Sequence, residues 1–240
     1  MSGERVSLLR EVYQNDPAWD KKPDPEIERR FQRVKAKLLG FTGEPKATLR
    51  TYPESDQSIP ARYARAYAWH KSAYPDRALY EVNNLLASAP NDPYFLELHG
   101  QILLESGKPD EALKSLRKAV QLTNNQPLLA SLFGHALIAT EDQSHYDEAE
   151  TVLKAAVSKD NQNPFAWYQL GVVYSHKGDT PRAQLATAES ALLQRNYPTA
   201  IRSSQIAMGG IKQHTPDWIR AQDISLIAKS EFERTGGRRR

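Results

Sequence analysis

Small residues recur along this chain at a nearly constant interval. Four alanines lie 34, 37 and 34 residues apart, namely Ala78, Ala112, Ala149 and Ala183. Three glycines keep the intervals of 34 and 37, namely Gly100, Gly134 and Gly171. A period near 34 residues with helical content predicts an array of helix–turn–helix units, each burying its apolar face on its neighbour. Such an array presents a long surface for binding and needs no second core.

One copy of the pattern shows what each position does. Pro164 stands where the first residue of a helix needs no partner for its N–H group. The residues that share one face of that helix, at steps of three and four, are Trp167, Leu170, Gly171 and Tyr174. The Gly178–Pro181 stretch then ends one helix and begins the next. Gly171 and Ala183 are small where we expect two helices to pack closely.

These residues resemble the signature of the tetratricopeptide repeat (TPR) family. The copy over 164–197 matches it best, the copies over 93–126 and 127–163 keep the glycine and alanines, and the copy over 59–92 is weaker. Residues 141–145 carry three extra residues, which accounts for the interval of 37. The resemblance implies an all-α fold, a right-handed TPR superhelix (α-solenoid) of about four repeats with helical caps.

The expected organisation has three parts. Residues 1–58 hold N-terminal helices over about 4–13 and 25–39 and an extended link over 42–58, all packing on the array. Residues 59–197 form the four TPR units. Residues 198–240 form capping helices, the first broken at Gly209-Gly210, and a basic tail that includes Arg238 to Arg240.

Composition excludes several classes of function. The chain has no cysteine, which excludes disulfides, thiol catalysis and cysteine-based zinc sites. Its net charge of +3 is too small to indicate nucleic-acid binding, and no apolar run approaches the ~18 residues of a membrane span. The first residues lack the apolar core of a signal peptide. Basic residues over 29–37 face away from an apolar stripe of Ile27, Phe31, Val34 and Leu38, so we expect a solvated basic helix face.

Segments outside the repeat signature carry a closer resemblance. They are residues 4–10, RVKAKLLGF at 33–41, residues 49–66 with LRTYPESD, residues 186–193, and WIRAQDI at 218–224. Together they resemble the C-terminal half of BepA-like bacterial zinc metalloproteases, of the alphaproteobacterial type. In that family a catalytic domain with an H-E-x-x-H motif precedes a TPR domain, and the proteins are exported and associated with outer-membrane protein quality control.

The chain lacks the chemistry of that catalytic half. None of its six histidines is followed by Glu, and no two lie four residues apart, so no H-E-x-x-H zinc site is present. His145 and Glu148 lie three apart, where Glu is a common first-turn residue. No nucleophile elbow or phosphate-binding glycine loop occurs either. We therefore expect no enzyme, no cofactor and no metal in this chain, with zinc only in the absent catalytic domain.

The resemblance to TPR proteins also implies a binding groove. Its lining positions on the first helix of each repeat carry over to Tyr63, Tyr67, His70, Tyr94, Glu97, Gln101, Glu105, Ser131, His135, Phe165, Tyr168 and His176, with Ile138 and Ser175 beside them. Aromatic and scattered polar groups suit a protein or an extended peptide. The same side chains could instead pack between repeats. The basic clamp that holds a peptide's terminal carboxylate in some TPR modules is missing.

Two interpretations of function remain open. In the first, the chain is the non-catalytic, substrate-recruiting TPR module of a metalloprotease, with the catalytic domain in the same parent chain and a periplasmic location. In the second, it is a free-standing TPR adaptor that scaffolds an unrelated complex, in the cytoplasm if the chain as given is the whole product. Neither involves nucleic acid or a transmembrane segment.

Overall fold

The computed structural model describes residues 3–14, 16, 21–22 and 24–236, and these contain α-helices, one short 3-10 helix and no strand. The helices up to residue 122 are α1 (Gly3–Tyr13), α2 (Pro25–Thr42), α3 (Pro45–Thr51), α4 (Ile59–Lys71), α5 (Pro75–Ser88), α6 (Pro93–Glu105) and α7 (Pro109–Leu122). The others are α8 (Pro127–Ala139), η1 (Gln143–His145), α9 (Tyr146–Lys159), α10 (Pro164–His176), α11 (Thr180–Leu193), α12 (Tyr197–Gly210) and α13 (Pro216–Gly236). The expected all-α solenoid of helix–turn–helix units is confirmed.

The chain divides into two compact units, residues 1–73 and 74–240, each described here by itself. The boundary lies inside residues 59–92, which were expected to form the first repeat. In the first unit, α2 and α3 both pack on α4. The division of the chain into an N-terminal part, four repeats and a cap remains a prediction, because the helix pairs alone do not define where a repeat begins.

Close approach of α2 and α4 determines the packing of the first unit. Ala36 and Gly40 are the buried residues of α2, and a Cβ at Gly40 would lie 2.8 Å from the Ala64 carbonyl oxygen. At the end of α4, Lys71 donates to the Phe41 and Gly43 carbonyls at 2.8 and 2.7 Å. These contacts hold the two helices with the small-residue face of α2 inward.

Parts of two expectations for the first unit were wrong. α2 was expected to reach about residue 39 and to end at Gly40 and Gly43; it continues through Gly40 to Thr42, and Gly43 caps it. The supposed extended link over 42–58 contains α3, whose first turn is capped by the Glu44 side chain accepting from the Ala47 N–H group at 2.8 Å. The rest of that link is anchored by Arg65, which is buried and donates to the Pro53 and Asp56 carbonyls.

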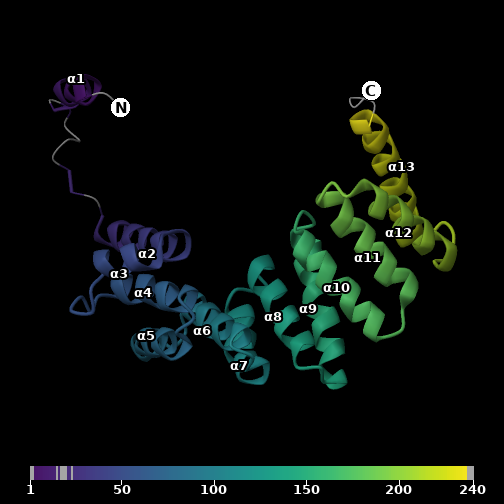
Figure 1. The fold of residues 1–240 in the computed structure, drawn as a ribbon, viewed down its shortest axis with the longest axis horizontal. Coiled ribbons are helices and arrows are strands. Elements are labelled where there is room, and N and C mark those ends of the chain that lie inside the picture. Colours follow the sequence, from purple (N-terminus) through teal and green to yellow (C-terminus); the bar gives the residue numbers. More distant parts are fainter. Residues whose placement is uncertain (1–2, 15, 17–20, 23, 237–240) are drawn as a thin grey trace. The chain divides into compact units, whose positions relative to one another are not determined.

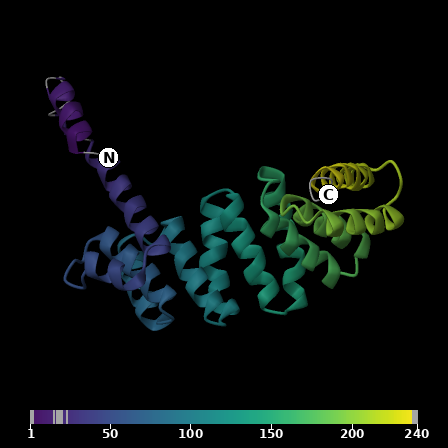
Figure 2. The ribbon, with the colours of Figure 1, turned by 45° about the horizontal axis from the view of Figure 1, so that its top comes forward.

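In the second unit the helices run alternately up and down and stack side by side (Figures 1 and 2). The sequence begins most of them in the same way, with a proline in the first turn. Before it stands a residue whose side chain accepts from backbone N–H groups, such as Asp92, Gln126 or Asn163. These caps satisfy donors that a helix N-terminus otherwise leaves without partners.

The recurring glycines are not equivalent. A Cβ at Gly100 would lie 2.4 Å from Leu116 Cγ, and one at Gly134 would lie 2.5 Å from Leu153 Cγ. At Gly171 the nearest atom would be the Ala183 carbonyl oxygen at 3.3 Å. The first two repeats of the second unit therefore need the absence of a side chain, whereas the third leaves almost enough room for one.

The C-terminal helices continue the up-and-down stacking of the second unit. α12 packs on α11, and α13 packs on both. α12 was expected to reach about Met208 and to end at Gly209-Gly210; it ends at Gly210, where a Cβ would meet Pro181 Cγ at 2.5 Å. The buried Glu189 of α11 accepts two bonds from Arg220 of α13, at 2.5 and 2.7 Å. The basic tail at 237–240 lies outside the described residues.

Candidate functional site: one face of α6, α8 and α10

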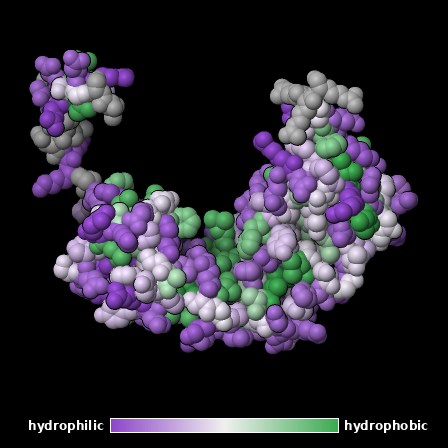
Figure 3. Space-filling view, viewed as in Figure 1, coloured by the Kyte–Doolittle hydropathy of each residue, from purple (hydrophilic) through white to green (hydrophobic). Residues whose placement is uncertain are grey.

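The first helices of three successive pairs are α6, α8 and α10, and α8 contacts both of the others within the second unit. They carry nine of the twelve residues expected to line a groove. Figure 3 shows hydrophobic side chains reaching the surface around these helices among hydrophilic neighbours. Since the three helices start with the same proline-led turn, equivalent positions on them fall on one face of the stack.

An apolar column marks the beginning of these helices. The residue directly after each proline is large, apolar and exposed, and the three are Tyr94, Leu128 and Phe165. Tyr168, one turn beyond Phe165, is 58% exposed. Leu128 was missed among the expected residues, although its place after Pro127 is the same as that of the other two. Exposed aromatic residues in a row are typical of a surface that binds protein.

Polar contacts join α8 to α10 further along the two helices. The His135 ring lies edge-on to Phe165, with centroids 5.6 Å apart, and its Nδ1 is 2.9 Å from Gln169 Nε2. Ser131 is buried, donates to the Pro127 carbonyl at 2.7 Å and accepts from Asn163 at 3.5 Å. His135 and Ser131 thus position neighbouring helices, and Gln169, which the sequence reasoning missed, is one of the buried polar residues that link them.

The charged side chains on this face are acidic. Glu97 and Glu105 lie on α6, and Gln101 donates to Glu105 Oε1 at 2.8 Å. None of the three helices contains Lys or Arg. The absence of a basic clamp noted in the sequence therefore extends over the whole of α6, α8 and α10, which favours neutral or basic peptide over acidic peptide.

The expected groove residues of the first unit lie elsewhere. Tyr63 is 1% exposed and Tyr67 is buried, because α2 packs on the face of α4 that carries them. The Phe41 ring meets Tyr67 edge-on at 6.0 Å, and the Arg33 guanidinium lies 5.7 Å from the centre of the Tyr63 ring. His70 is half-buried. Tyr63 and Tyr67 are core residues of the first unit and offer no surface to a partner.

His176 also departs from the column. It lies at the exposed end of α10 and stacks on Tyr146 of α9, with centroids 4.8 Å apart. His145 and Glu148, considered as a metal pair, have other partners. His145 Nδ1 lies 2.8 Å from Thr140 Oγ1, and Glu148 accepts two bonds of 2.8 Å from Arg117 of α7. Glu148 serves to link α7 to α9.

The Arg117–Glu148 pair gives a pH prediction. The bonds from Arg117 hold the pKa of Glu148 below its ordinary value, so the pair's contribution is present above that value and is lost as pH falls through the lowered pKa. Both side chains are more than a third exposed, so the effect is small. We expect Glu148→Gln to lower the thermal midpoint at pH 7 and to make no difference well below pH ~4. A difference that persists at low pH would contradict this assignment.

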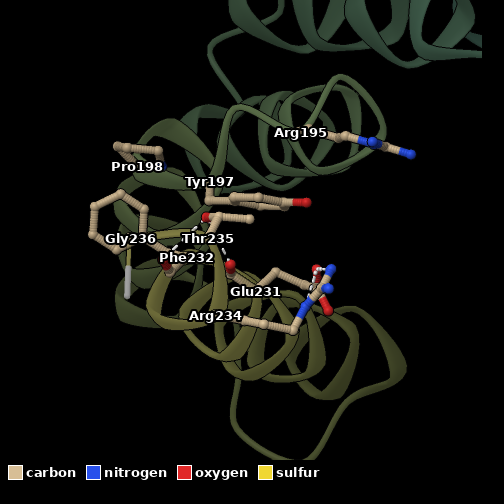
Figure 4. A pocket seen from close by; sticks show the side chains of 8 residues that line it. All are labelled: Arg195, Tyr197, Pro198, Glu231, Phe232, Arg234, Thr235 and Gly236. Carbon is tan, nitrogen blue, oxygen red and sulfur yellow. Dashed lines mark hydrogen bonds and ion pairs between the residues drawn. The ribbon is translucent and has the colours of Figure 1, made fainter. Parts of the chain in front are cut away.

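A hollow of about 570 Å³ lies in the C-terminal cap, between the start of α12 and the end of α13. Figure 4 shows its lining side chains, with Arg234 paired to Glu231 and the Thr235 hydroxyl bonded to backbone of its own helix. Arg195 and Tyr197 complete the polar part of the lining. Since the Arg234 charge is already neutralised by Glu231, this hollow is a weaker candidate than the face of α6, α8 and α10.

No helix among the described residues is long and apolar enough to cross a membrane.

Residues 82–200 match the family described as the cytochrome c-type biogenesis protein H TPR domain. The chain is 26% identical over 162 residues to the beta-barrel assembly-enhancing protease of Escherichia coli K12, which covers 65% of this chain and 32% of that protein. It spans about a third or less of the curated relatives it matches.

Solved structures show the same fold. YrrB, described as a TPR protein with an unusual peptide-binding site, superposes with a TM-score of 0.56 at 20% identity, covering 85% of this chain and 100% of YrrB. MamA from Desulfovibrio magneticus RS-1 superposes with a TM-score of 0.53 at 19% identity, covering 72% of this chain and 94% of MamA. The family match and these structures support a TPR fold for this chain.

Proposed function

We propose that the face of α6, α8 and α10 binds an extended segment of a partner protein, and that the chain recruits substrates for a zinc metalloprotease in bacterial envelope protein quality control. The observation that carries the binding role is the exposed column of Tyr94, Leu128 and Phe165 with Tyr168 beside it. An extended peptide alternates its side chains along its length, so apolar groups at intervals can meet successive members of such a column.

The link to a protease is supported by the beta-barrel assembly-enhancing protease, which matches 65% of this chain. In this proposal the catalytic domain lies in the same parent polypeptide, holds the zinc ion and works in the periplasm. Substrate captured by the TPR face is held near that domain, which raises its effective concentration there. The neutral-to-acidic face is compatible with unfolded polypeptide that lacks a strongly acidic stretch.

The alternative is a free-standing TPR adaptor, which the superposition with MamA and YrrB equally accommodates. An immunoblot of fractionated source cells with antibody to this chain separates the two. A band near 27 kDa in the cytosol supports the adaptor. A band larger by a catalytic domain, on the order of 200 residues, in the envelope fraction supports the protease.

The binding role makes a direct prediction. We expect Phe165→Ala with Tyr168→Ala to weaken binding of an unfolded outer-membrane β-barrel protein by roughly 10- to 100-fold, since truncating the two aromatic anchors together costs about 1.4–2.8 kcal/mol. Both side chains are substantially exposed, so the variant should fold. Fluorescence anisotropy with labelled, denatured substrate measures the affinity.

Tyr80→Ala is the matched control, because Tyr80 is an exposed aromatic of the same unit on α5, outside the three helices. It should bind as the unchanged chain does. Equal weakening by both variants would indicate non-specific adsorption on aromatic surface. Unchanged binding by the double variant would show that the column is not the site.

A further inference from the structure

An apolar stripe on α2 stays largely uncovered among the described residues of the first unit, and its last member, Phe41, touches Tyr67 edge-on. Its members are each more than half exposed, and they are Ile27, Phe31, Val34, Leu38 and Phe41. Successive members lie four, three, four and three residues apart. That alternation is the heptad spacing of a coiled-coil seam. The sequence had indicated the stripe through four of these residues, but the exposure of all five is a finding of the structure.

α2 cannot rotate about its own axis to bury the stripe. At about 100° per residue, Ala36 and Gly40 lie on the side of the helix opposite the stripe. Those two residues are buried against α4, where a Cβ at Gly40 would come within 2.8 Å of both Ala64 O and Tyr67 Cβ. Because only small residues allow this approach, packing on α4 holds the stripe outward.

The width of the stripe indicates what kind of partner fits it. Its five members span an arc of roughly 80° on the helix. A seam this narrow suits one neighbouring helix, whereas helices that lie in a membrane interface have a broader apolar face. A partner helix that presents large apolar side chains at the same spacing would pack its knobs between those of α2.

The charges beside the stripe indicate which charge a partner helix should carry. Arg30 and Lys37 lie along one edge of the stripe, where Glu26 pairs with Arg30 at 2.5 Å, and Lys35 with Glu28 lies along the other. Over its whole length α2 has five basic and two acidic side chains, a net charge of +3. A second copy of α2 would bring two helices of net positive charge together, which disfavours self-pairing, while a helix with acidic flanking residues would be complementary.

We propose that the apolar stripe of α2 docks an amphipathic helix of a partner protein whose seam is flanked by acidic residues. This surface belongs to the first unit and is separate from the peptide-binding face proposed for α6, α8 and α10. Each surface therefore takes its own ligand: an extended peptide on the second unit, and a preformed or induced helix on the first. The failure of one proposal would leave the other standing.

Two synthetic helical peptides about three heptads long test the proposal on the full chain. Both have leucine and isoleucine at the seam positions; one has Glu at the flanking positions and the other has Lys. We expect the acidic peptide to bind about tenfold or more tighter by fluorescence anisotropy, because several exposed charge pairs each contribute modestly. The preference should shrink as salt is raised.

Variants of exposed residues locate the binding. Phe31→Ser with Val34→Ser should reduce acidic-peptide affinity at least tenfold while leaving the circular dichroism spectrum and the thermal midpoint nearly unchanged. Leu226→Ser, an equally exposed apolar residue on α13, is the control and should bind normally. Arg30→Glu with Lys35→Glu should reverse the preference, so that the basic peptide binds better.

Other results would overturn the proposal. Equal binding of the two peptides, or binding of neither, removes the acidic helix as the occupant. Self-association in sedimentation that Phe31→Ser with Val34→Ser abolishes would assign the stripe to a second copy. Binding of anionic phospholipid vesicles that depends on the same residues, without a peptide preference, would assign it to a membrane surface.

Discussion

Replacing both Gly100 and Gly134 by alanine is expected to lower the free energy of unfolding of the second unit by about 1–4 kcal/mol. Each new Cβ would lie 2.4–2.5 Å from the Cγ atom of a fully buried leucine, Leu116 or Leu153. A leucine Cγ cannot swing away like the end of a long side chain, so the helices must separate. Overpacking of this kind costs about 1–3 kcal/mol per site and outweighs the ~1 kcal/mol that alanine gains in a helix.

Gly171→Ala is the matched control for this prediction. It makes the same substitution at the same repeat position, but the nearest atoms would be the Ala183 carbonyl oxygen at 3.3 Å and Ala186 Cβ at 3.4 Å. We expect its unfolding free energy to remain within about 1 kcal/mol of the unchanged chain. Urea unfolding followed by far-ultraviolet circular dichroism provides the comparison, with midpoints reported because solenoids can unfold in steps.

A compensating change tests the cause. Leu153→Val shortens the side chain that the Gly134→Ala methyl group would meet, so it should cost less in the Gly134→Ala background than in the unchanged chain. A positive coupling of this kind is expected for residues in contact. Simple additivity of the two changes, or equal destabilisation by all three glycine substitutions, would show that backbone freedom rather than close packing explains these glycines.

The repeated helices could be predicted from the sequence because their information is local. The interval between small residues, the proline in each first turn and the capping residue before it all act within one helix pair. Gly171 was expected to lie at a close helix contact, and a Cβ there would come 3.3 Å from the Ala183 carbonyl oxygen; the equivalent Gly100 and Gly134 are in still closer contacts. Leu128 could have been identified by the same rule, since it follows Pro127 as Phe165 follows Pro164.

The first unit could not be predicted in the same way. An apolar stripe indicates which face of a helix can pack, but not whether a partner of suitable shape is available. In α2 the large apolar residues stay exposed, and the small face with Ala36 and Gly40 makes the contact. That choice depends on α4, and it also explains why Tyr63 and Tyr67 are buried rather than lining a groove.

Arg220→Met is expected to lower the free energy of unfolding by about 2–4 kcal/mol and to loosen the C-terminal helices. The side chain of Glu189 is 5% exposed, and its carboxylate accepts both described bonds from Arg220, at 2.5 and 2.7 Å. Removing the cation leaves a buried carboxylate without compensation. Because the Arg220 side chain is 46% exposed, we place the cost below the upper end found for fully buried pairs.

A second variant distinguishes loss of the ion pair from loss of side-chain volume as the cause of the lower stability. Glu189→Leu with Arg220→Met removes both charges and keeps apolar volume, so its stability should return to within about 1 kcal/mol of the unchanged chain. Hydrogen exchange of α12 and α13 gives the local readout, since Arg220 joins α13 to α11. Fast exchange confined to these helices in Arg220→Met, reversed in the double variant, would show that one ion pair holds the cap on the array. Equal loss of stability in both variants would instead assign the effect to packing by the Arg220 side chain, because its aliphatic stem also covers apolar surface.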